Sequence, residues 1–262
     1  MIGAIIGDIV GSRFEFHPAS QRDFTLFHPA CHFTDDTVLT IAVAYAILHQ
    51  QDYGVSIKAF GRRYPKAGYG GSFRRWLASE DSAPYRSWGN GSAMRVSPVG
   101  FAFNSVERVL SEAAASAACT HNHPEGIKGA QSVALAILRA RNGWSKADIK
   151  AEISERFGYD LARRLDDIQP DYSFDVSCQG SVPESIIAFL ESDSYESAIC
   201  NAIWLDGDAD TMACIAGGIA QAFYGEVAAE SVVLAQAYLP EEFRQVISDF
   251  DQACKNGSSF AL

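Results

Sequence analysis

Apolar residues recur along most of the chain at three- and four-residue spacing, which is the period of one face of an α-helix. Alternation of apolar and polar positions, the mark of a half-buried strand, is almost absent. The pattern therefore predicts a predominantly α-helical protein. The predicted helices cover residues 2–13, 36–50, 55–64, 71–79, 105–119, 124–141, 145–157, 182–191, 194–204, 209–224 and 240–254.

Three stretches within these helices are apolar and mostly small on every side, not on one face only. They are residues 38–47, 133–138 and 212–223. A helix that is apolar all round lies at the centre of a protein, and small residues let helix backbones approach closely. We expect these stretches to form the centre of a helical bundle.

Two of the central helices begin at clusters of carboxylate and hydroxyl side chains. Residues 34–37 read Thr-Asp-Asp-Thr, and residues 206–211 read Asp-Gly-Asp-Ala-Asp-Thr. Such residues are favoured helix N-caps, but a cap needs only one of them. Oxygen ligands also suit Mg²⁺, Mn²⁺ or Ca²⁺, and a cation would relieve the repulsion between adjacent carboxylates. The residues alone leave capping and metal binding both open. The four carboxylates that would balance two divalent cations are Asp35, Asp36, Asp208 and Asp210.

Long irregular stretches join some of the predicted helices, at residues 65–72 and 80–98, and both are rich in glycine. A compact helical domain seldom keeps such loops without a functional reason. Glycine lets backbone N–H groups approach a phosphate, although a plain turn between helices is the commoner origin of such residues. A third loop, residues 120–124, carries two of the six histidines.

Composition narrows the class of protein. With 262 residues, 48% of them hydrophobic, the chain can build a large core, and no linker or repeat divides it. We therefore expect one domain over residues 1–262. The net charge of −11 argues against a surface for nucleic acid or for an anionic membrane. The apolar N-terminus has no basic segment and is interrupted by Asp8, unlike a signal peptide or membrane span. Six scattered cysteines lack metal-site spacing. A soluble, cytoplasmic protein is predicted.

Six short motifs stand in a particular order along the chain. They are Gly3-Ala4-Ile5-Ile6-Gly7-Asp8 with Gly11-Ser12 and Glu15, Thr34-Asp35-Asp36-Thr37, Gly68-Tyr69-Gly70-Gly71, Gly89-Asn90-Gly91-Ser92-Ala93-Met94-Arg95, Thr120-His121, and Gly207-Asp208-Ala209-Asp210-Thr211. Together they resemble the ADP-ribosylglycohydrolase family, which includes the dinitrogenase reductase-activating glycohydrolases. Each motif alone is weak, but six in family order, from residue 1 to about 225, are specific.

The resemblance implies an all-α, orthogonally packed fold and a centre of two divalent cations, Mg²⁺ or Mn²⁺. The implied reaction is hydrolysis of the glycosidic bond that joins ADP-ribose to an acceptor. That acceptor is an arginine or serine side chain of a protein, a small molecule, or a nucleic-acid base. Carried over residue by residue, the implied metal ligands are Thr34, Asp35, Asp36, Asp208, Asp210 and Thr211.

The resemblance also suggests roles around this centre. Asp36 would serve as ligand and base, and Glu15 as ligand or proton carrier. Asp8 is expected to be structural, because a buried carboxylate needs hydrogen-bond partners. The residues expected to contact the diphosphate and ribose are Gly70, Gly71, Ser72, Asn90, Gly91, Ser92 and His121. The candidates for stacking on adenine are Tyr69, Phe73, Trp88 and Tyr172.

Two departures from the family pattern leave questions open. Relatives commonly carry glycine where this chain has Asp206, a carboxylate that would disturb the metal, support its ligands or point to solvent. The acidic residue with which arginine-directed relatives contact the guanidinium has no clear counterpart, so the acceptor stays open. A catalytically silent member that binds ADP-ribose or serves a structural role is the alternative function. The presence of all six implied ligands argues against it.

Overall fold

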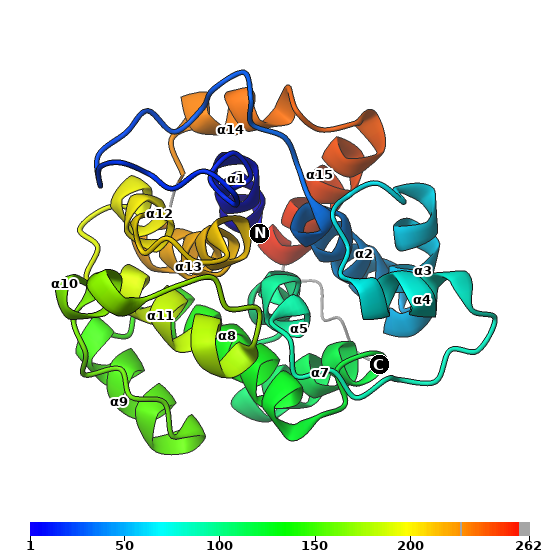
Figure 1. The fold of residues 1–262 in the computed structure, drawn as a ribbon. Coiled ribbons are helices and arrows are strands. Elements are labelled where there is room, and N and C mark those ends of the chain that lie inside the picture. The colour runs from blue at the N-terminus through cyan, green and yellow to red at the C-terminus, as the bar shows by residue number, and fades with distance from the viewer. Residues whose placement is uncertain (226, 257–262) are drawn as a thin grey trace.

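The computed structural model describes residues 1–225 and 227–256, and within them it contains helices and loops but no strand (Figure 1). The backbone of Gly89 forms an isolated antiparallel bridge with Ser177. The helices are α1 (Ile2–Gly11), α2 (Asp35–His49), α3 (Tyr53–Arg63), α4 (Gly71–Ala78), α5 (Gly91–Met94), α6 (Ser97–Ala102), α7 (Val106–Ala118), α8 (Pro124–Arg141), α9 (Lys146–Phe157), α10 (Leu165–Ile168), the 3-10 helix η1 (Gln169–Asp171), α11 (Cys178–Leu190), α12 (Tyr195–Trp204), α13 (Ala209–Tyr224), α14 (Ala229–Gln236) and α15 (Glu241–Lys255).

Every helix that the apolar pattern predicts has a counterpart, so the expected all-α class is confirmed. The expectation that residues 80–98 are wholly irregular is wrong, because they contain α5 and the first residues of α6. The pattern also missed α10 and α14, and it started α11 four residues late. Helices α5, α6 and α10, with four to six residues, span less than two turns, too few for a 3.6-residue period to stand out.

Helix α1 packs along α13 at the centre of the molecule, in closer contact than any other pair of helices (Figure 1). Its glycines make this approach possible. A Cβ atom at Gly7 would lie 2.1 Å from the carbonyl oxygen of Ala213, and one at Gly11 would lie 2.5 Å from the Cα of Asp210. The two helices run antiparallel, so the end of α1 lies beside the acidic start of α13.

A single buried carboxylate joins α1 to the start of α2. Asp8 accepts hydrogen bonds from the backbone N–H of Thr34 (3.0 Å) and of Thr37 (3.1 Å). It also accepts one from the hydroxyl of Thr34 (2.6 Å) and one from the hydroxyl of Thr37. The structural role expected for Asp8 is confirmed. Both acidic motifs therefore meet at the end of α1.

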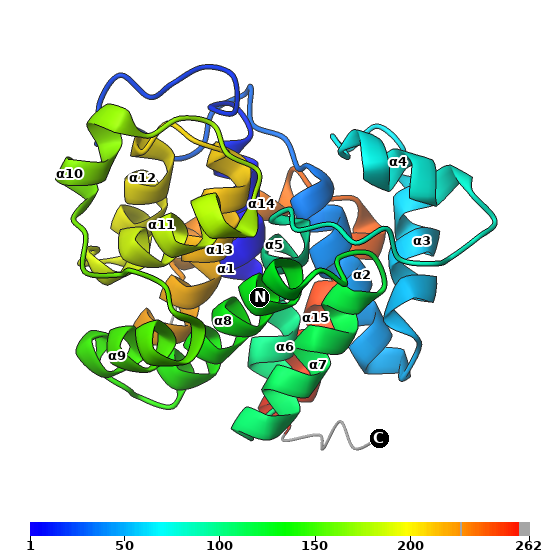
Figure 2. The ribbon, with the colours of Figure 1, turned by 60° about the horizontal axis from the view of Figure 1, so that its bottom comes forward.

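The short helix α5 packs against α2, α8 and α13 and lies between the two acidic helix starts (Figure 2). On the other side of α2, helix α15 covers the core, and α3 and α4 extend outward. Within residues 1–225 and 227–256, the helices lack the combination of length and apolar character that a membrane crossing requires.

Candidate active site

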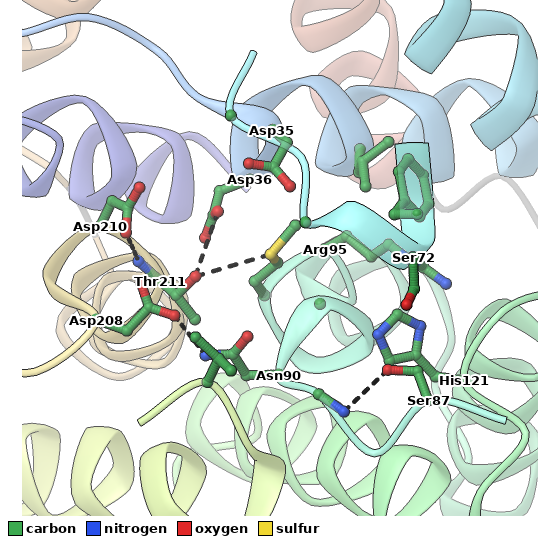
Figure 3. Close-up of a pocket in the computed structure, with 18 of the residues that line it drawn as sticks. Asp35, Asp36, Ser72, Ser87, Asn90, Arg95, His121, Asp208, Asp210 and Thr211 are labelled. Atoms are coloured by element: carbon green, nitrogen blue, oxygen red, sulfur yellow. Dashed lines mark hydrogen bonds between the residues drawn. The ribbon is translucent and has the colours of Figure 1, made fainter. Parts of the chain in front are cut away.

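A cavity of about 420 Å³ opens where α2, α4, α5 and α13 come together. Carboxylates from three segments form one side of it, which we call the acidic wall. The opposite side, the loop wall, is formed by glycine-rich segments and by His121 (Figure 3). The acidic wall contains Glu15, Asp35, Asp36, Asp208 and Asp210, and the loop wall contains Gly70, Gly71, Ser72, Ser87, Gly89, Asn90, Gly91 and His121.

The acidic side chains form two overlapping groups. Oxygen atoms of Asp8, Asp36 and Asp210 lie within 4.8 Å of one another, and so do those of Glu15, Asp208 and Asp210. Asp210 belongs to both groups. Among the described residues, the ion pairs involve none of the carboxyl groups in the two groups. Two oxygen-rich sets that share one carboxylate are thus left without a cationic partner from the protein.

Hydrogen bonds set the orientation of the acidic side chains. The Thr211 hydroxyl lies 3.3 Å from Oδ2 of Asp36, to which it donates. The Asn90 amide donates to Oδ2 of Asp208 over 2.7 Å (Figure 3). Thr34 caps α2 by accepting from the backbone N–H of Asp36. The capping interpretation of the first motif is therefore confirmed for Thr34, and one threonine suffices for the cap.

The crowding of like charges raises the pKa values of these groups. Burial, followed by the charge of Asp210, raises the pKa of Asp35 and of Asp36 well above its usual range. The same causes raise the pKa of Glu15 to about 7 and that of Asp8 to about 6. The buried Oδ1 of Asp36 has no hydrogen-bond partner among the described residues. Hard oxygen donors in such a setting fit a divalent cation, which would hold them ionised.

The loop wall offers backbone N–H groups. Helix α4 begins at Gly71 with Gly70 as its N-cap, and no side chain caps it. The first N–H groups of a helix lack partners inside the helix and favour an anion. Gly70, Gly71 and Ser72 are exposed on the cavity, as a phosphate-binding segment requires.

Two residues from the expected site do not line the cavity. Ser92 is fully buried, and its hydroxyl donates to the carbonyl of Gly126 (2.7 Å). Thr34 is buried behind the acidic wall, where its hydroxyl donates to Asp8. Both side chains lie behind the cavity lining, where the Thr34 hydroxyl also lies 3.4 Å from Oδ2 of Asp36.

The structure brings in lining residues that the motifs did not identify as site residues, namely Leu39, Gly68, Tyr85, Ser87, Gly89, Met94, Arg95, Phe174 and Val176. Several of these already stood within the quoted motifs, whereas residues 172–177 reach the cavity through the bridge between Gly89 and Ser177. The local sequence does not predict that contact, because it joins segments far apart in the chain.

The aromatic candidates for adenine now differ in position. Phe73 lines the cavity, and Tyr69 stacks behind it with ring centroids 5.1 Å apart. The Tyr172 hydroxyl donates to the carbonyl of Gly180, which ties that residue to the fold. Trp88 lies between two lining residues and is 55% exposed. Phe73 is therefore the candidate that lines the cavity, and Trp88 is the exposed candidate beside it.

Asp206, the departure from the family pattern, is exposed and does not line the cavity. Its φ of 61° lies in the left-handed region, which glycine adopts without steric cost. The glycine common in relatives therefore matches a backbone requirement here. An aspartate tolerates this conformation better than most residues, so the turn is kept.

Comparison with known proteins identifies relatives of this chain. Residues 1–258 match the family described as ADP-ribosylglycohydrolase. The chain is 25% identical to "ADP-ribosylhydrolase ARH3" of Mus musculus, in an alignment that covers 96% of this chain and 87% of the relative. It is 25% identical to "ADP-ribosylarginine hydrolase Tri1" of Pseudomonas putida, over 86% of this chain and 69% of that protein.

A solved structure described as "ADP-ribosylglycohydrolase-related protein complex" has the same fold, with a TM-score of 0.72 at 22% sequence identity. The match covers 99% of this chain and 96% of the other. Taken with the family match over nearly the whole length, these likenesses agree with the order of motifs along the sequence. The chain belongs to the ADP-ribosylglycohydrolase family.

Proposed function

We propose that this protein is a metal-dependent hydrolase that cleaves the glycosidic bond between ADP-ribose and an acceptor, and so reverses ADP-ribosylation. The observation that carries the proposal is the pair of oxygen groups that share Asp210, at one side of a cavity whose other side presents backbone N–H groups. Relatives whose names denote hydrolysis of ADP-ribosyl bonds support the same reaction for this chain.

Two cations, Mg²⁺ or Mn²⁺, fit the acidic wall. Asp36, Asp208 and Asp210 would hold them with Asp35, Thr34 and Thr211, and Glu15 would complete the set on the side of Asp208. When bound, the cations would supply positive charge that polarises the ribose hydroxyls and a water molecule. Thr211 and Asn90 keep Asp36 and Asp208 oriented toward this role.

Proton transfer falls to Glu15 and Asp36. Glu15 is half-buried on the cavity, and among the described residues no hydrogen bond holds its carboxyl group. It is therefore free to move between binding a cation and carrying a proton. Asp36, by contrast, is held by Thr211 and has one oxygen without a partner, which is available to accept a proton.

The rest of the cavity would orient the substrate. The N–H groups at the start of α4 and the turn at Gly89 to Gly91 suit the diphosphate, with His121 beside them. Phe73 and Trp88 offer rings for adenine. As the glycosidic bond breaks, positive charge develops on the ribose, and the nearby carboxylates stabilise it.

The test is a panel assay of ADP-ribose release from arginine-, serine- and O-acyl-linked substrates with Mg²⁺ or Mn²⁺. Release is expected from at least one substrate and should vanish in Asp208→Ala and with EDTA. The matched control is Asp206→Ala, an exposed carboxylate two residues away, which should keep its activity. No release from any substrate, with ADP-ribose still bound, would instead favour a silent binding protein.

We also propose that the chain acts as one domain. Helix α1 packs on α13, and α2 packs on α15, so segments from both halves of the sequence share one core around the cavity.

A further inference from the structure

Three polar side chains form a row at the loop wall. The Arg95 guanidinium is fully buried, and its Nη2 donates to the carbonyl of Ser116 (2.8 Å) and to Oγ1 of Thr120 (2.9 Å). Thr120 is also fully buried, and its Oγ1 lies 2.8 Å from Nδ1 of His121. His121 lines the loop wall, in the expected diphosphate site, and Arg95 also borders the cavity.

The direction of these hydrogen bonds follows from chemistry. A guanidinium has donors only, so Thr120 must accept from Arg95. The hydroxyl has one hydrogen left to give, and two atoms lie in reach: Nδ1 of His121 at 2.8 Å and Sγ of Cys119 at 4.0 Å. Sulfur is a weak acceptor, and the cation polarises the hydroxyl into a stronger donor. The hydrogen therefore goes to Nδ1.

The imidazole of His121 is consequently constrained. Burial and the charge of Arg95 lower the pKa of His121 well below its usual range, so the ring is neutral. A neutral ring that accepts at Nδ1 carries its proton on Nε2. Among the described residues nothing hydrogen-bonds to Nε2. A Cβ atom at Gly91 would lie only 3.1 Å from Nε2, so the absence of a side chain there keeps this donor uncovered.

We propose that Arg95 and Thr120 are positioning residues that fix His121 as the neutral Nε2–H tautomer, so that the ring presents one hydrogen-bond donor to an oxygen of the ligand. The identity of that oxygen, on the diphosphate or a ribose of ADP-ribose, rests on the proposed function. His121 then binds and orients the substrate, and it takes no part in proton transfer, which belongs to the acidic wall.

The first experiment reads the tautomer in the full-length protein without ligand, by ¹⁵N NMR of histidine-labelled protein at pH 7. The His121 signals are assigned by their loss in His121→Gln. We expect an unprotonated Nδ1 and a protonated Nε2 in the wild type. Thr120→Val removes the hydroxyl at similar volume and should release the preference, whereas Thr120→Ser should keep it. A protonated Nδ1 in the wild type, or a Thr120→Val spectrum identical to it, would overturn the proposal.

The second experiment measures ADP-ribose binding with Mg²⁺ by calorimetry. Thr120→Val should weaken ADP-ribose binding about fivefold to tenfold, because the hydrogen bond from Nε2 of His121 to the ligand would be lost in the other tautomer. Thr120→Ser should restore the binding. His121→Gln, which keeps a donor near the place of Nε2, should bind better than His121→Ala. Unchanged binding in Thr120→Val would refute the ligand contact. Failure of the wild type itself to bind ADP-ribose would refute the proposed function, while the tautomer result would still stand on its own.

Discussion

On the acidic wall, Asp36, Asp208 and Asp210 crowd together, and among the described residues no positive side chain forms an ion pair with them. On the loop wall, a threonine joins a buried arginine to a neutral histidine through hydrogen bonds within the protein. Under the proposed function, a cation would supply the positive charge that the acidic wall lacks, whereas the loop wall is held by hydrogen bonds within the protein. We therefore expect removal of the cations to disturb the acidic wall more than the loop wall.

The largest expected effect is that of replacing Asp210, the carboxylate that both oxygen groups share. Asp210→Asn removes one charge from both oxygen groups with little change in volume. We expect kcat/KM to fall by about a thousandfold or more, corresponding to roughly 4 kcal/mol of transition-state stabilisation. Steady-state kinetics at saturating Mg²⁺ measure it, with Asp206→Asn as the control that should stay within about twofold of wild type. A loss smaller than about tenfold would show that the acidic wall is not the reaction centre.

Asp8, which lies behind the acidic wall, differs from the carboxylates of that wall because groups of the protein donate hydrogen bonds to both of its oxygens. Asp8→Ala removes the acceptor of two backbone N–H groups and of the Thr37 hydroxyl, and leaves the Thr34 hydroxyl only the longer contact to Asp36. We expect the free energy of unfolding to fall by about 3 kcal/mol. Urea denaturation with Mg²⁺ present measures this change. Asp52→Ala, which removes an exposed cap at α3, should cost about 1 kcal/mol. An equal cost for the two variants would contradict the role given to Asp8.

The stability of the cation-free protein should depend on pH. Folding raises the pKa of Asp8 to about 6 and that of Glu15 to about 7, so between pH 4 and 7 the native state binds more protons than the unfolded state. Stability of cation-free protein must then fall as pH rises, by on the order of 1 kcal/mol between pH 5.5 and pH 8 from Asp8 alone. Urea denaturation after EDTA treatment, at pH 5.5 and pH 8, measures it. Added Mg²⁺ should offset the loss at pH 8. A cation-free stability that rises toward pH 8 would contradict this account.

The smallest expected effect is that of replacing Asp206, which lies next to the acidic wall in the sequence. Asp206→Gly relieves the left-handed backbone conformation and should raise the free energy of unfolding by up to about 1 kcal/mol. Activity should not change, because the side chain is exposed outside the cavity. Gln50→Gly, at the left-handed end of α2, should give a similar gain and serves as the matched control. A change in activity for Asp206→Gly would mean that this carboxylate does act on the centre.

The acidic wall was more accessible to sequence reasoning than the loop wall. Its residues stand in two compact motifs at the starts of long apolar helices, where local pattern is informative. Even there, the sharing of Asp210 between two oxygen groups and the burial of Thr34 behind the wall depend on how α1 packs against α13. Such packing depends on the glycines of α1, whose significance shows only once their partner helix is known.

On the loop wall, the glycine motifs identified segments that line the cavity, but not how each of their side chains is placed. Ser92 turns into the core, while Arg95 and Thr120, quoted only as parts of motifs, support His121. Phe174 lines the cavity but belongs to a segment in which the sequence shows no motif. These contacts join residues far apart in the chain, and neither periodicity nor spacing predicts them.

The most direct test of the central claim is a count of Mn²⁺ ions bound per chain, by titration of EDTA-treated protein with electron paramagnetic resonance detection of free Mn²⁺. The account predicts two ions for the wild type and for Asp206→Asn, and the loss of at least one for Asp210→Asn. Absence of binding by the wild type, or equal binding by Asp210→Asn, would contradict the claim that the acidic wall is a cation centre.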